Sequence, residues 1–251
     1  MTGISSDSGG PAGPPVFVTT HWSVVLAAAR NGAPGTQAAL EHLCRTYWYP
    51  IYYFVRRRGY STHDAQDLTQ GFFARLLEKH WIADAEPSRG LFRSFILLML
   101  KRFLAAEWRK ANAQKRGGHF QALALPLDSA EIRYTLEPAD NHSPEQAFEK
   151  KWALALLDTV LRDLGADYER DGNGRLLEAL KPSLTGSREA QPYAALASAL
   201  GMSEGAVRVA VHRLRERYRK RLRAEVADSV ATPAEVDSEL RHLFRVLARA
   251  R

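Results

Sequence analysis

The stretch from Pro192 to Arg223 most constrains what this chain can form, because two runs of helical periodicity meet there at one glycine. That residue is Gly201, and glycine readily adopts the left-handed conformation that ends a helix. Ser203 follows as a natural N-cap, with Glu204 favourable in the first turn. The apolar residues that form the inner faces of the two helices are Leu196, Ala197, Leu200, Val207, Val211 and Leu214. The pattern predicts a helix-turn-helix.

The second of these helices is strongly basic. Its basic residues are Arg208, His212, Arg213, Arg215, Arg217, Arg219, Lys220, Arg221 and Arg223, with Glu216 as the acid among them. In a DNA-binding helix-turn-helix this helix enters the major groove, where cations neutralise phosphates. The net charge of +7 also favours a polyanionic partner. A solvated basic face is the alternative interpretation, and the placement directly after the corner favours DNA binding.

The segment SEGAVRVAVHRLRERYRKRL resembles the C-terminal DNA-binding region of bacterial sigma factors of the extracytoplasmic-function (ECF) group in the sigma-70 class. That region typically reads S-E-G-T-V-K-S-R-L-H-R-A-R. This chain departs at Ala206, Val209 and Ala210, where the family often has Thr, Ser and Arg. The resemblance implies that the upstream (−35) promoter element is read by Ser203, Glu204, Ala206, Arg208, Val209, His212, Arg213, Arg215 and Arg217.

A second block, residues 36–118, resembles the first conserved domain of the same group. DAQDLTQGFFARL stands for the family's D-A-E-D-L-V-Q-E-x-F-x-R-L, and FRSFILLML stands for F-R-x-W/F-L. The resemblance implies that core RNA polymerase is contacted by Asp64, Asp67, Leu68, Gln70, Phe72 and Phe73. It implies that the loop after Lys79 and the helix from Phe92 to Arg109 open and read the −10 promoter element. The DNA-contacting residues there would be Arg93, Lys101, Arg102, Phe103, Trp108 and Arg109.

Two residues of the first block differ from the family. Gln66 and Gly71 replace acids, which suggests two missing charges at the polymerase face. One hypothesis is that a Ser/Thr kinase restores the charge by phosphorylating Thr69, because a phosphate adds about −1.5 to −2 charges. Control by the C-terminal helix, through residues 232–251, is an alternative, and an anti-sigma factor is a further candidate partner.

The expected fold is all-α, with two helical domains joined by a flexible linker. We divide the chain into a disordered N-terminus (1–18), a domain resembling sigma region 2 (19–118), a linker (119–142), a domain resembling sigma region 4 (143–227) and a C-terminal extension helix (228–251). A short helix starting at Thr19 or Thr20 and ending at Arg30 would precede the first block.

Further signals place the helix ends. Thr36 caps a helix in which Pro50 is expected to cause a kink or a division. Ser61 with Asp64 three residues later fits a capping box for the next helix. The helix after Ser88 is apolar almost all round in its first half, so we expect it to be central. Ser143-Pro144-Glu145-Gln146 starts a helix that we expect to end at Leu164, and Thr232-Pro233-Ala234-Glu235 starts the last one. The apolar stripe expected on this last helix is formed by Val236, Leu240, Leu243, Phe244 and Leu247.

No catalytic constellation has a specific spacing in this sequence, so we expect no enzyme, no metal site and no cofactor. Zinc-protease and phosphate-binding loop motifs are absent from the chain. Cys44 is the only cysteine and falls on an apolar helical stripe, where a buried, unreactive thiol is usual. The sequence shows neither a signal peptide nor an apolar run of membrane-spanning length, so we expect a cytoplasmic protein.

The two motif blocks together lead to the expectation of a sigma factor, which binds core RNA polymerase and directs it to promoter DNA at a subset of genes. A stand-alone helix-turn-helix regulator and a polymerase-binding adaptor without DNA contacts remain as alternatives. The first block distinguishes them, because a free regulator needs no acidic-aromatic docking helix followed by an aromatic-basic one.

Overall fold

The computed structural model describes residues 36–76, 91–113, 131, 133–135, 142–184, 192–230 and 232–248. The helices are α2 (Thr36–Arg57), α3 (Thr62–Leu76), α5 (Phe92–Ala113), α7 (Pro144–Arg170), α8 (Gly174–Leu180), α9 (Tyr193–Leu200), α10 (Glu204–Ser229) and α11 (Val236–Ala248). No strand occurs among the described residues, and the predicted all-α class is confirmed. The N-terminal segment with its predicted helix, the loop after Lys79, the Ser88 cap and most of the linker lie outside these ranges.

The central helix is α2, not α5 as the sequence suggested. Every residue from Thr46 to Val55 on α2 is buried, whereas Leu98 in the first half of α5 is 49% exposed. Packing on all sides explains why α2 also continues through Pro50, where a kink or a division was expected, so the helix is not divided there. Proline removes one backbone donor, and the burial of the surrounding aromatic run YWYPIYYF offsets this loss.

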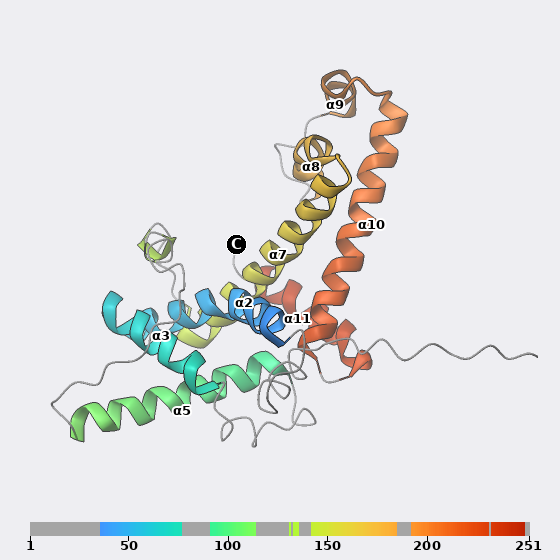
Figure 1. Cartoon of the computed structure of the whole chain (residues 1–251). Coiled ribbons are helices and arrows are strands. Elements are labelled where there is room, and N and C mark those ends of the chain that lie inside the picture. Colours follow the sequence, from blue (N-terminus) through green and yellow to red (C-terminus); the bar gives the residue numbers. More distant parts are fainter. Residues whose placement is uncertain are drawn as a thin grey trace, which may run out of the picture.

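Two long helices, α7 and α10, connect the two ends of the molecule (Figure 1). The first half of α7 packs against α2, where Phe148 and Trp152 enter the same core as Tyr47. The last turns of α10 join this core through Leu222 and Val226. The core therefore takes residues from both sides of the boundary predicted at residue 143, and the division into two domains stays a prediction.

Part of the predicted linker is tied to α2. Glu131 and residues 133–135 are helical, and the Arg56 guanidinium donates to both Glu131 carboxylate oxygens at 3.0 and 3.2 Å. Arg133 lies over the Tyr49 ring, 4.2 Å from its centroid. These described linker residues are therefore held in place by charged and aromatic contacts.

Most helix starts agree with their sequence signals. Ser143 forms the predicted capping box with Gln146 at the start of α7, and the Asp64 N–H donates to Ser61 Oγ at 3.1 Å at the start of α3. The end predicted for α7 at Leu164 was wrong, because the helix continues to Arg170. Tyr168, only 6% exposed, packs in the core of α8 and α9 and stabilises this extra turn and a half.

The C-terminal extension contains helix α11, which packs against both α7 and α10. Its capping box at Thr232 and Glu235 is present, and Val236 and Leu243 are buried. Phe244, which was expected on the apolar stripe, is instead 56% exposed. The buried stripe of α11 is therefore narrower than the sequence pattern suggested.

The thiol of Cys44 is expected to react slowly in the folded protein. Burial, with a contribution from Glu41, raises the pKa of Cys44 from 9.0 to about 11, which leaves roughly a hundredfold less reactive thiolate at neutral pH. The measurement is the rate of labelling by a chromogenic disulfide, with the urea-unfolded chain as control. Equal rates in the folded and unfolded chains would contradict this prediction.

Candidate nucleic-acid interface

A tight corner joins α9 to α10. Gly201 has a φ of 63°, in the left-handed region, and the Met202 N–H donates to the Ala197 carbonyl at 3.0 Å. Ser203 Oγ accepts a hydrogen bond from the Ala206 N–H at 3.2 Å and caps α10. The two helices bend by 100° across the corner. This angle lies within the roughly 90–120° of helix-turn-helix units.

The corner rests on a second core below it. This core contains the buried side chains of Leu164, Tyr168, Leu177, Leu180, Leu196, Ala197, Val207, Val211 and Leu214. They come from α7, α8, α9 and α10, so α7 and α8 support both helices of the corner. Leu200, also predicted on the inner face, is half-buried at the edge of this core. The orientation of α10 is therefore fixed by apolar packing on its inner face.

The first half of α10 presents a polar and cationic face to solvent. The predicted DNA-contacting residues that are exposed there are Ser203, Glu204, Arg208, Val209, His212 and Arg213, while Ala206 is half-buried. The Arg208 guanidinium lies 5.8 Å from the centroid of the Tyr193 ring, a contact that orients it. Val209 is 50% exposed and adds an apolar contact of the kind that suits a thymine methyl group.

Farther along α10, several arginines bind the protein itself. Arg215 donates to the Ser183 carbonyl at 2.8 Å, and Arg217 pairs with Asp171 at 3.5 Å and lies over the Tyr168 ring. These contacts hold α10 against the end of α7 and the segment that follows α8. For Arg215 and Arg217, a role in reading DNA stays a prediction, and the structure gives each a structural role that the sequence did not indicate.

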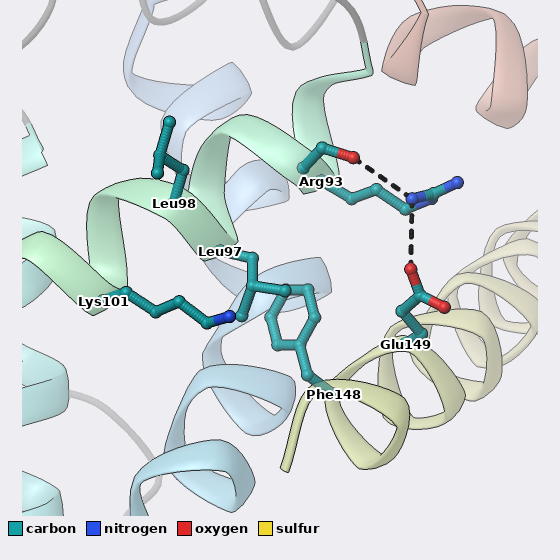
Figure 2. A pocket seen from close by; sticks show the side chains of 7 residues that line it. Arg93, Leu97, Leu98, Lys101, Phe148 and Glu149 are labelled. Atoms are coloured by element: carbon teal, nitrogen blue, oxygen red, sulfur yellow. Dashed lines mark hydrogen bonds and ion pairs between the residues drawn. The ribbon is translucent and has the colours of Figure 1, made fainter. Parts of the chain in front are cut away.

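Two residues predicted to contact DNA on α5 are buried. Phe103 is 2% exposed and meets the Phe72 ring edge-on, with 5.9 Å between the ring centroids. The Arg93 side chain is 6% exposed and binds Glu239 of α11 through Nε–Oε1 at 2.7 Å and Nη2–Oε2 at 3.0 Å. Figure 2 shows Arg93 also turned toward Glu149 of α7. In this structure both side chains are buried and not available to DNA, and a DNA contact by either residue stays a prediction.

The second half of α5 borders an open pocket of about 570 Å³. Its lining residues are Arg58, Tyr60, Lys101, Leu104, Ala105, Trp108 and Arg109. Trp108 is 62% exposed, and Arg102 is exposed on the same helix. The pocket thus combines aromatic rings with the cations Arg58, Lys101 and Arg109, a combination that holds unstacked bases and their phosphates.

Two residues of this pocket were missed from the sequence. Neither Arg58 nor Tyr60 is among the residues predicted to contact DNA. The turn at Gly59, where φ is 89°, folds this segment back after α2. The run of arginines before a glycine and a tyrosine was the available signal, but its proximity to α5 depends on tertiary packing.

The predicted polymerase face on α3 divides into exposed and buried residues. Asp64 and Asp67 are exposed and Leu68 is half-buried. Gln70, Phe72 and Phe73 are 8%, 0% and 1% exposed, so none of the three is on the surface of this structure, and their contact with core polymerase stays a prediction. Both rings pack in the central core, which the apolar period of α3 requires. The surface available for a partner is the acidic edge at Asp64 and Asp67.

The structure also changes the interpretation of Gly71 and Thr69. A Cβ on Gly71 would lie 3.3 Å from Cζ of Phe103, so this glycine allows α3 and α5 to approach closely. An acid there would be buried rather than presented to a partner. Thr69 is 0% exposed and its hydroxyl donates to the Ala65 carbonyl at 2.6 Å. A kinase could not reach this hydroxyl in the folded structure, which argues against phosphorylation of Thr69.

Within the described ranges, no group of three or more His, Cys, Asp or Glu side chains could hold a metal ion. No single helix there is long and apolar enough to cross a membrane. The bent pair of α9 and α10 meets the length and composition requirements only when both helices are taken together.

Comparison with known proteins finds a relative among the bacterial sigma factors. The chain is 26% identical over 193 residues to the ECF RNA polymerase sigma factor SigE of Mycolicibacterium smegmatis. The match covers 74% of this chain and 63% of the relative, so the chain spans less than two thirds of that protein's length. No family model and no solved structure matches the chain. The similarity thus supports, at low identity, a relation to ECF sigma factors.

Proposed function

We propose that this chain is a sigma factor of the ECF group, which binds core RNA polymerase and directs it to a subset of promoters. The observation that carries the proposal is that one chain has two exposed surfaces that suit nucleic acid in different ways. The exposed face of α10 suits duplex DNA, and the aromatic-cationic pocket beside α5 suits a melted strand. The similarity to the sigma factor from M. smegmatis supports the same assignment.

In this proposal the corner of α9 and α10 acts as a DNA-binding helix-turn-helix for the upstream element. Arg208, His212 and Arg213 lie on the exposed face of α10 and provide donors to base edges and phosphates. The apolar Val209 lies among them and replaces a polar residue of the family pattern. We therefore expect a preference for thymine at the base position that Val209 contacts.

The downstream element would be held as a single strand. Trp108 offers a stacking surface for a base, while Lys101, Arg102 and Arg109 attract the phosphate backbone. The acidic edge of Asp64 and Asp67 on α3 would contact a basic surface of core polymerase. None of these roles requires a bound cofactor or a catalytic residue.

The test is reconstituted transcription with purified core polymerase on genomic fragments, with start sites mapped. New start sites that depend on this chain support the proposal. Tight duplex binding without any change in core polymerase specificity would instead favour a stand-alone helix-turn-helix regulator. Binding to core without DNA contacts would favour an adaptor.

Replacing Arg213 or Arg208 with alanine should weaken binding to the upstream duplex. If each side chain reads a base, the loss is about 1–3 kcal/mol, roughly a five- to 150-fold rise in Kd. Mobility shifts at a fixed salt concentration, on duplexes from the mapped promoters, measure this effect. Arg223→Ala is the matched control, because Arg223 is an exposed arginine of the same helix that pairs with Asp237 at 2.5 Å. Equal affinities for the wild type and both reading-face variants would rule out this role of α10.

A further inference from the structure

A carboxylate from α7 lies at the edge of the pocket proposed for the melted strand. Oε1 of Glu145 is 2.8 Å from Nζ of Lys101 and 3.7 Å from Nη2 of Arg58. Lys101 and Arg58 are two of the cations that line the pocket, and they come from α5 and from the residue after α2. Two cations from different elements therefore converge on one oxygen.

The convergence marks a point of positive potential. The hydrogen bond from Lys101, with help from Arg58, holds the pKa of Glu145 below its usual range, so the carboxylate is ionised at neutral pH. The Arg58 guanidinium is oriented by the Phe54 ring, 5.2 Å from its centroid. Lys101 in turn lies between this pocket and the smaller one drawn in Figure 2, which Phe148 and Glu149 of α7 help to form.

These ion pairs are only partly shielded from water. The side chains of Glu145, Arg58 and Lys101 are 36%, 44% and 40% exposed. Ion pairs at such exposure contribute little to stability and are screened by salt. A phosphodiester, like a carboxylate, has two oxygens that share a negative charge and accept hydrogen bonds from Lys and Arg. A strand that also stacks on Trp108 could therefore displace Glu145 at low cost.

We propose that Lys101 and Arg58 form a phosphate-binding site for a single nucleic-acid strand, and that Glu145 occupies this site in the free protein. The proposal rests on the proposed function and adds to it, because it assigns a position for one backbone phosphate and an internal competitor for it. Glu145 belongs to the first turn of α7, whose next turns are buried in the central core through Phe148 and Trp152. Strand binding thereby loosens one contact between α7 and α5.

The test compares variants of the full chain for binding to a short fluorescent single-stranded DNA of mixed sequence. Glu145→Gln keeps the side chain's size and removes its charge, so affinity should rise about two- to fivefold. The slope of log affinity against log salt should stay near the wild-type value in Glu145→Gln, because the strand places a phosphate in the same site in both proteins, whereas Lys101→Gln should reduce the slope by about 0.7. The gain in affinity should vanish in the double variant Glu145→Gln/Lys101→Gln, because the phosphate site is then incomplete.

Glu178→Gln is the control for net charge, since Glu178 is an exposed acid on α8 that pairs with Lys181 at 3.5 Å. An equal gain in Glu178→Gln, an unchanged affinity in Glu145→Gln, or a gain that persists without Lys101 would each overturn the proposal. If Glu145→Gln does not fold, Glu145→Asp replaces it, because the shorter side chain lengthens both contacts.

The outcomes of this experiment distinguish a failure of the proposed function from a failure of this inference. If Trp108→Ala and Lys101→Gln both bind the strand like the wild type, the pocket is not the strand site, and both proposals about it fall. If those variants lose affinity while Glu145→Gln shows no gain, the pocket keeps its role and only the competition by Glu145 is excluded.

Discussion

Replacing Arg93 with alanine is expected to lower the free energy of unfolding by about 3–5 kcal/mol, because it leaves a buried carboxylate without its partner. The side chain of Glu239 is 1% exposed, and its two oxygens accept from Nε and Nη2 of Arg93 at 2.7 and 3.0 Å. The Arg93 guanidinium also lies 5.2 Å from the centroid of the Trp152 ring and 3.4 Å from Glu149. Urea unfolding followed by circular dichroism measures the loss.

The double variant Arg93→Met/Glu239→Leu distinguishes the loss of the ion pair from the cost of leaving one buried charge unpaired. Replacing both ions by apolar side chains removes the unpaired charge, so most of the stability should return. Arg109→Ala, an exposed change on the same helix, should alter stability by less than about 0.5 kcal/mol. A loss below about 1 kcal/mol in Arg93→Ala would contradict burial of this ion pair.

His242 offers a second readout of the same network. Its pKa is lowered by burial and then by the positive charge of Arg93, whereas Glu149 and Glu239 raise it. Removing Arg93 should therefore raise the pKa of His242, which NMR titration of the imidazole would detect. Because the folded-state pKa lies below its usual value, protonation of His242 opposes folding as the pH falls through about 6.5 in the wild type.

Local signals in the sequence predicted much of this fold, because helix caps depend on neighbouring residues. The caps at Ser61, Ser143 and Ser203 and the left-handed Gly201 occur as expected. The spacing of the apolar residues also predicted which side of α10 is buried and which side is exposed. These features need only the hydrogen bonds and backbone conformations of one or two helical turns, so a single sequence contains enough information.

The errors concern contacts between residues far apart in the sequence. Arg93 occupies a position that the family resemblance gives to DNA, but its partner Glu239 follows 146 residues later, on a helix that the minimal family layout lacks. Gly71 was interpreted as a missing acid, although the near approach of Phe103 explains a glycine there. In both cases, the deciding neighbour is placed by tertiary packing, which helical periodicity does not specify.

Reversing the charge of Asp67 to arginine is expected to abolish co-purification with core RNA polymerase. Asp67 is exposed on the acidic edge of α3, and its carboxylate lies 3.2 Å from Nδ1 of His63. If this edge meets a basic surface, an arginine places like charges together, which costs several kcal/mol, and each 1.4 kcal/mol reduces affinity about tenfold.

The fold should not change, because the Asp67 side chain is 60% exposed and makes no buried contact among the described residues. Helical content and thermal unfolding therefore serve as the first control, with stability expected to stay within about 0.5 kcal/mol of the wild type. Glu178→Arg, an equal reversal on α8, is the second control and should leave polymerase binding intact. Normal co-purification of Asp67→Arg would show that the acidic edge of α3 is not the polymerase face.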